Sequence, residues 1–150
     1  MNEQGFGILD NRFLSRSIGL LDPAPPLVLR QTERVEAAIQ VLKDNRVGCV
    51  VIADEADRVV GIFTERDVLL KLDFKNYSGN AFISEFMTAN PKAVTMTDSI
   101  AYVLQLMSEG GFRHVPIIDH DGMGVGLVSV KDIVDYIVGS LTSELSSLPV

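Results

Sequence analysis

Residues 61–67 (GIFTERD) and residues 126–132 (GLVSVKD) follow one pattern and lie 65 positions apart. Each has a glycine, two apolar residues, a hydroxyl residue, a basic residue and an aspartate, and each precedes an apolar helical pattern. A hydroxyl residue followed three positions later by an acid is typical of a capping box at a helix start. The second occurrence at the same offset indicates that the chain contains a duplicated unit.

The hydrophobic pattern repeats at the same offset. Apolar residues at helical spacing form one buried stripe in each copy, at Val35, Ala38, Ile39 and Leu42, and at Ile100, Val103, Leu104 and Met107. Two β-branched-rich runs follow each stripe, at residues 49–53 and 59–63 and at residues 115–118 and 125–128, with a turn-rich acidic stretch between them. Each copy closes with an amphipathic helix, so the unit is β-α-β-β-α and the fold class is α/β (α+β).

The repeat divides the chain into five parts. Residues 18–72 and 83–140 form the two repeats, residues 73–82 (polar) the linker, residues 1–17 a lead-in, and residues 141–150 a Ser-rich tail. Phe13, Leu14 and the preceding Ile8 and Leu9 could form a short lead-in helix. Thr32 and Thr97, each followed by an acid, are expected N-caps. A single unit would leave one sheet face apolar and open, so the two units are expected to pack as one body.

Composition favours one soluble globular domain. The 150 residues are 47% hydrophobic and 22% charged, and the single cysteine, Cys49, excludes an intramolecular disulfide. The net charge of −7 discourages nonspecific binding to nucleic acid or to an anionic membrane. The longest apolar run, residues 47–53, is far short of the ~20 residues of a membrane span. The first residues lack a secretory signal, so a cytoplasmic protein is expected.

With the two motifs, the segments VGCVV (47–51), FMT (86–88) and FRHVPI (112–117) make the repeat resemble the cystathionine-β-synthase (CBS) domain, present as a tandem pair or Bateman module. This resemblance covers about residues 18–140. It implies two units packed sheet to sheet with pseudo-two-fold symmetry, and a disc-like homodimer. It also implies two clefts between the repeats that bind adenosine-containing ligands: AMP, ADP, ATP or S-adenosylmethionine.

The motif has two compatible interpretations. It caps a helix, or it also presents a hydroxyl and an acceptor-only carboxylate to the donors of a ribose, beside the helix N-terminus. By resemblance, Asp67 and Asp132 hold ribose hydroxyls, while Thr64 and Ser129 contact ribose or phosphate. The expected walls of the Asp132 cleft are Leu21, Leu27, Val47, Gly48 and Leu127, and those of the Asp67 cleft are Ile62, Lys92 and Phe112.

The two copies differ in basic residues. Arg66 and Lys131 stand in the two motifs, but Arg113-His114 in the second copy has Gly48-Cys49 as its counterpart in the first. Because a phosphate needs charge-assisted donors, the Asp132 cleft is predicted to bind phosphorylated nucleotide better than the Asp67 cleft. The alternative for His114 is a partly buried imidazole with a structural role.

The expected function is therefore a ligand-sensing regulatory module rather than an enzyme, acting on an unknown regulated protein. One alternative is a structural dimerisation or interaction module with vestigial clefts. Another is a regulatory fragment of a larger enzyme or transporter. No catalytic set of nucleophile, base and orienting residue is found. His114, His120 and Asp121 lack metal-ligand spacing, and Cys49 reads as a small core residue.

Overall fold

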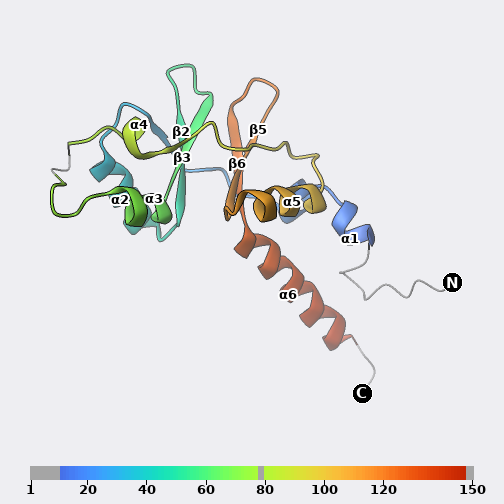
Figure 1. Cartoon of the computed structure of the whole chain (residues 1–150). Helices are drawn as coiled ribbons and strands as arrows, with labels where there is room; N and C mark the ends of the chain where they lie inside the picture. The colour runs from blue at the N-terminus through green and yellow to red at the C-terminus, as the bar shows by residue number, and fades with distance from the viewer. Residues whose placement is uncertain (1–10, 78–79, 148–150) are drawn as a thin grey trace.

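The computed structural model describes residues 11–77 and 80–147 (Figure 1). The first half of the chain contains, in order, α1 (Asn11–Ser15), the 3-10 helix η2 (Ile18–Leu21), β1 (Val28–Arg30), α2 (Val35–Asn45), β2 (Cys49–Ala53), β3 (Val59–Thr64) and α3 (Glu65–Lys71). The second half contains α4 (Ile83–Phe86), β4 (Thr88–Ala89), α5 (Ile100–Gly110), β5 (His114–Ile118), β6 (Gly124–Ser129) and α6 (Val130–Ser146). The predicted α/β class and its duplicated β-α-β-β-α order are confirmed.

Both copies build the same sheet core. In the first, β1 runs parallel to β2, and β2, β3 and β4 pair antiparallel, with Val51 opposite Ile62. In the second, β5 and β6 pair antiparallel, and Val94 bridges to Ile117 in parallel, as β1 pairs with β2. The expected hairpins are therefore present in both copies.

The two sheets meet between the hairpins β2–β3 and β5–β6, which lie side by side in Figure 1. Val59 N donates to Gly122 O at 2.9 Å, and the backbones of Arg58 and Met123 form an isolated antiparallel β-bridge. A Cβ added at Gly124 of β6 would lie 3.2 Å from Val59 Cγ2 of β3, so the two hairpins approach each other closely at this point. The two repeats consequently pack as one body, as the open sheet faces predicted.

Each hydrophobic core contains a segment from the other half of the chain. Ile83 of α4 packs in the core of the first repeat, with Phe63 and Ile52. Phe13 of α1 and Ile18 of η2 pack in the core of the second repeat, and all five side chains are fully or almost fully buried. The lead-in helix is thus present at Asn11–Ser15, while Ile8 and Leu9 lie outside the described residues.

Three helix ends differ from the sequence-based expectation. The N-caps are Arg34 for α2 and Ser99 for α5, not Thr32 and Thr97, because the first helical turn begins two residues later than the hydroxyls predicted. Helix α6 continues to Ser146, past the expected tail boundary at 140, since Leu141 and Leu145 extend its apolar spacing. A bilayer-spanning helix is not found among the described residues.

Candidate functional site

Both motif aspartates form the capping boxes that their spacing predicts. Oδ2 of Asp67 accepts from Thr64 N at 2.9 Å, and Thr64 Oγ1 accepts from Asp67 N at 3.2 Å. Oδ2 of Asp132 accepts from Ser129 N at 2.8 Å, and Ser129 Oγ accepts from Asp132 N at 3.1 Å. One oxygen of each carboxylate therefore serves its own helix, and only Oδ1 is left for a ligand.

Oδ1 of Asp67 is already engaged. Thr88 Oγ1 donates to it at 3.0 Å, and Lys71 Nζ lies 2.8 Å away. Asp67 is only 4% exposed. Met87 fills the adjoining space, because a Cβ on Gly61 would lie 2.5 Å from Met87 Sδ. In this arrangement the predicted Asp67 cleft is closed by side chains of the chain itself.

Asp132 is exposed, and its Oδ1 has no hydrogen-bond partner within residues 11–77 and 80–147. Asp132 lines a cavity of about 470 Å³. The segment after η2, the strand β6 and the first turns of α6 line this cavity, with Leu21, Asp22, Pro23, Ala24, Leu127, Val128, Asp132, Asp135 and Tyr136. The Asp132 carboxylate thus stands in a hollow lined by apolar side chains and by two further carboxylates, Asp22 and Asp135, and the hollow is large enough for a small organic molecule.

The sequence-predicted walls are found only in part. Leu21 and Leu127 line the cavity with Asp132, as expected. Leu27, Val47 and Gly48 do not line it. Gly48 instead faces the ring of His114, at 3.5 Å from its Cε1 to an added Cβ.

The expected walls of the Asp67 cleft are placed as follows. Ile62 is buried in β3. Lys92 is exposed in the loop after β4. The Phe112 ring packs over Gly110, at 1.9 Å from an added Cβ.

Sequence reasoning missed several lining residues, of which Tyr136 is the most informative. It lies one helical turn after Asp132, so the two side chains share a face of α6 and both reach the cavity. Its ring stacks on Phe13 with centroids 5.6 Å apart. The i, i+4 spacing from Asp132 was the available signal. No such signal was available for Asp22, Pro23 and Ala24, because the path of the segment before β1 decides their position. Asp135 of α6 was also missed.

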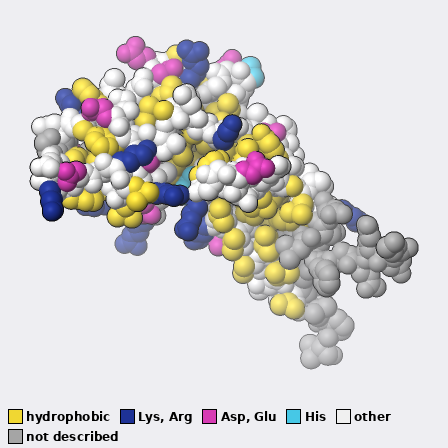
Figure 2. Space-filling view, in the orientation of Figure 1, with side chains coloured by type: hydrophobic (Ala, Val, Ile, Leu, Met, Phe, Trp, Pro, Cys, Tyr) yellow, Lys and Arg dark blue, Asp and Glu magenta, His cyan; other side chains and the backbone are white. Residues whose placement is uncertain are grey.

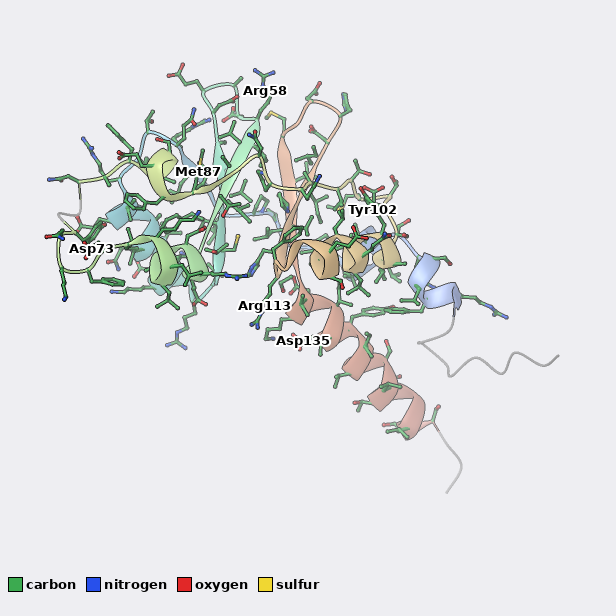
Figure 3. The ribbon with its side chains drawn as sticks, in the orientation of Figure 1. Arg58, Asp73, Met87, Tyr102, Arg113 and Asp135 are labelled. Atoms are coloured by element: carbon green, nitrogen blue, oxygen red, sulfur yellow. The ribbon has the colours of Figure 1, made fainter. Side chains whose placement is uncertain are left out.

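Arg66, Lys131 and Arg113 differ in how many contacts already engage their charged groups. Arg66 Nη1 donates to Gly111 O at 2.9 Å and so links the two repeats. Lys131 Nζ lies 2.5 Å from Asp135 Oδ2, and this hydrogen bond raises the lysine pKa. Arg113 is exposed, and it projects near the start of α6 in Figure 3, where its carbonyl accepts from Val130 N. Arg113 is thus better placed than Arg66 to meet an anion.

His114 is half-buried between the repeats, beside Gly48. Burial lowers its pKa from 6.5, and the charge of Arg113 acts in the same direction, while the carboxylates of Asp132 and Glu65 oppose the change. The imidazole is therefore favoured in its neutral form. The charge of Asp132 acts on the imidazole, but His114 does not line the Asp132 cavity, so its role in the second cleft stays a prediction. Its burial agrees with the structural alternative.

The depressed pKa of His114 predicts a loss of stability in mild acid. The unfolded chain binds the proton more readily, so the stability is complete above pH 6.5 and falls as the pH drops through the folded-state pKa. In urea unfolding between pH 5 and pH 7.5, His114→Gln should flatten this slope. The control is His120→Gln, since His120 is an exposed side chain at a turn. An unchanged slope in His114→Gln would contradict the assignment.

Other candidate chemistry is absent from the described part of the chain or is accounted for. No three His, Cys, Asp or Glu side chains come together as a metal-binding group within the described ranges. Cys49 is buried in β2, as expected for a core residue. Burial, with the negative charge of Asp67, raises the pKa of its thiol to about 12, so the thiol stays protonated.

Two β-α-β-β-α units packed as one body, each with a hydroxyl-x-x-Asp start to its last helix, define a duplicated α/β domain architecture. The sequence profile of the CBS domain matches residues 21–73 and 83–139. The chain belongs to the CBS domain family and contains two copies of the domain.

Known proteins agree with this assignment. An uncharacterised 17.7 kDa protein of Acidianus ambivalens is 33% identical over 106 residues, which cover 71% of this chain and 63% of that protein. The CBS domain pair of MJ0100, solved with 5′-methylthioadenosine and S-adenosylmethionine, is 25% identical with a TM-score of 0.73, and the match covers 81% of this chain and 98% of that one. The CBS protein PAE2072 of Pyrobaculum aerophilum, solved with AMP, shares the fold at 24% identity and a TM-score of 0.73, over 84% of this chain and 98% of that one. The chain spans about three fifths of the length of curated relatives such as the Acidianus protein.

Proposed function

We propose that this chain is a regulatory module that binds an adenosine-containing ligand, AMP, ADP, ATP or S-adenosylmethionine, in the Asp132 cavity. The observation that carries the proposal is the free Oδ1 of Asp132 at the edge of a cavity of about 470 Å³. Structures of CBS proteins with AMP and with S-adenosylmethionine support the ligand class.

The chemistry of the cavity suits an adenosine. Asp132 Oδ1 accepts from a ribose hydroxyl, and the Ser129 hydroxyl, which accepts from Asp132 N, can still donate its own hydrogen. Leu21, Leu127 and the Tyr136 ring offer apolar and aromatic surface to the base. Arg113, His114 and Lys131 are the candidates for a phosphate; Val47 and Gly48 stay predicted contacts of a larger ligand.

The same cavity gives a route to regulation. Its walls come from the segment before β1 and from β6 and α6, so a bound ligand contacts both ends of the chain at once. A ligand shifts an equilibrium only if it binds one arrangement better than another. We propose that nucleotide binding biases the position of α6, which projects from the body in Figure 1, and that a regulated protein reads this change.

Titration with ligand tests the function. AMP, ATP and S-adenosylmethionine are added separately to the full chain, and a ligand at 100 times its Kd should stabilise it by about 2.7 kcal/mol. Asp132→Ala should weaken binding at least about tenfold. The matched control is Asp121→Ala, an exposed acid in the β5–β6 turn. No stabilisation by any of the three would favour the structural module with vestigial clefts.

One observation does favour vestigial character, but only for the first cleft: Asp67 is buried and engaged with Lys71 and Thr88. The roles predicted for Ile62, Thr64, Arg66 and Asp67 in ligand binding are therefore not part of the proposed site. We propose a regulatory rather than a catalytic role, acting in the cytoplasm.

The exposed apolar face of α3 and α6 supports the expected homodimer. Leu69 is 72% exposed on α3, and its pseudo-symmetric counterpart on α6 is Val134, which is also exposed. Exposed apolar residues continue along α6 at alternating spacings of four and three, at Val134, Val138, Leu141 and Leu145. Figure 2 shows hydrophobic side chains gathered along this projecting helix. A pseudo-two-fold patch suits a self-complementary interface.

Val138→Glu should convert the dimer to a monomer. Val138 is 55% exposed, so a charge there spares the core but is unfavourable in an apolar helix contact. Sedimentation velocity at matched concentrations measures the state. Ser108→Glu on the exposed side of α5 is the control and should remain dimeric. A wild-type monomer at about 100 µM would contradict the proposal.

A further inference from the structure

Shifting the residues that line the Asp132 cavity by 65 positions gives the residues around Asp67. Asp22 corresponds to Met87, and Tyr136 to Lys71. In the second copy these positions line an open cavity, and in the first they close the space over Asp67. The two clefts are therefore built from equivalent backbone segments and differ in the side chains that occupy them.

The Lys71 ammonium occupies the space next to Asp67 Oδ1 in the first cleft, and three oxygens surround it. Its ammonium lies 2.8 Å from Asp67 Oδ1, 3.1 Å from Phe86 O and 3.3 Å from Met87 O. An ammonium has three hydrogens to donate, and these three oxygens match them. The aliphatic stem reaches in from the surface, where the side chain keeps 41% of its exposure. Asp67 Oδ1, the oxygen equivalent to the free one in Asp132, is thereby neutralised and hydrogen-bonded.

Met87 occupies the remaining space. Its thioether lies directly on β3, with Sδ 2.5 Å and Cγ 3.1 Å from an added Cβ at Gly61. Figure 3 shows Met87 beside this strand. The equivalent glycine in β6, Gly126, has Ile117 and Met96 as its neighbours instead, and the counterpart of Met87, Asp22, lines the cavity.

We infer that Lys71 and Met87 are built-in occupants of the first cleft, and that these two residues determine that only the Asp132 cleft accepts an adenosine ligand. The inference rests on the proposed function for the second cleft. It makes the asymmetry between the repeats a consequence chiefly of the two side chains that fill the first cleft, beside the Thr88 hydroxyl that donates to the same Asp67 oxygen, rather than of the missing basic residues in the first copy.

The direct test removes the occupants in a chain whose second cleft is disabled. AMP is titrated calorimetrically into the full chain, into Asp132→Ala, and into Asp132→Ala combined with Lys71→Ala and Met87→Ala. The wild type should bind AMP at a single site, Asp132→Ala should lose it, and the triple variant should regain a site that Asp67→Ala then removes. Lys43→Ala, which removes an exposed lysine at the end of α2, is the control for lost charge.

A reciprocal variant keeps the inference testable if the triple variant does not fold. Asp22→Met with Tyr136→Lys transplants the occupants into the second cleft, and AMP affinity should fall at least about tenfold with the helical circular dichroism retained. A folded triple variant without AMP binding, or a transplant variant within about twofold of wild-type affinity, would overturn the inference and leave the proposed function standing. A wild type that binds no AMP, with a triple variant that does, would instead reject the Asp132 site and keep the occupants.

Discussion

Asp67→Ala is expected to lower the free energy of unfolding by about 3 kcal/mol, and the Tm by about 10 °C, whereas Asp132→Ala lowers it by about 1 kcal/mol. Both substitutions remove a capping box. Only Asp67 also loses the ion pair with Lys71 and the hydrogen bond from Thr88, both in a nearly buried setting. Removing one partner of such a pair is costly because the other is left uncompensated.

The partial exposure of Lys71 limits the loss. Its ammonium can turn toward water once Asp67 is gone, so the effect stays nearer 3 than the roughly 5 kcal/mol seen for fully buried pairs. Urea unfolding of both variants at one protein concentration measures the difference, since dimerisation would otherwise shift the apparent stability. Equal losses in the two variants would mean that the contacts at Oδ1 of Asp67 contribute nothing beyond the cap.

The sequence was sufficient to predict the architecture because a duplicated pattern supplies its own check. The stripe from Val35 to Leu42 could be assigned to a helix with more certainty once Ile100 to Met107 showed it again. The sequence pattern could not show that Ile18 packs in the second repeat and Ile83 in the first. Periodicity identifies which face of a segment is buried, but not which core buries it.

The candidate site was predictable to a similar depth. The motif located both aspartates and their caps, and the i, i+4 spacing of Asp67 and Lys71 is a known ion-pair spacing on a helix. That Met87 lies on Gly61 depends on the pairing of β3 with β4, which places Thr88 opposite Ile62. Arg66 is the clearest departure: expected near phosphate, it bonds Gly111 O of the other repeat, a contact between residues 45 positions apart.

The second large expected effect concerns Ile18 and Ile83, each of which packs in the core of the repeat that does not follow it directly in the sequence. Ile18→Ala and Ile83→Ala should each cost about 3 kcal/mol, because each side chain is fully buried and leaves a cavity in a packed core. Ile18→Ala should destabilise the second repeat, and Ile83→Ala should destabilise the first. Ile18→Ala removes a contact from the core that holds Val103 and Val115 in the second repeat, although Ile18 precedes the first strand of the chain.

Hydrogen exchange separates this crossed arrangement from simple sequential packing. In Ile18→Ala the amides of α5 and β5 should lose protection first, and in Ile83→Ala those of α2 and β2, because local openings follow the core that is weakened. The hydrogen bonds from Ile18 N to Asp98 O and from Ile83 N to Glu33 O, at 2.7 and 2.8 Å, tie the same segments to the same repeats. Ala101→Gly on the exposed side of α5 is a control for helix fraying alone. If Ile18→Ala opened α2 and β2 instead, each segment would belong to its neighbouring repeat, and the Asp132 cavity, walled on one side by the residues that follow η2, would lose its structural basis.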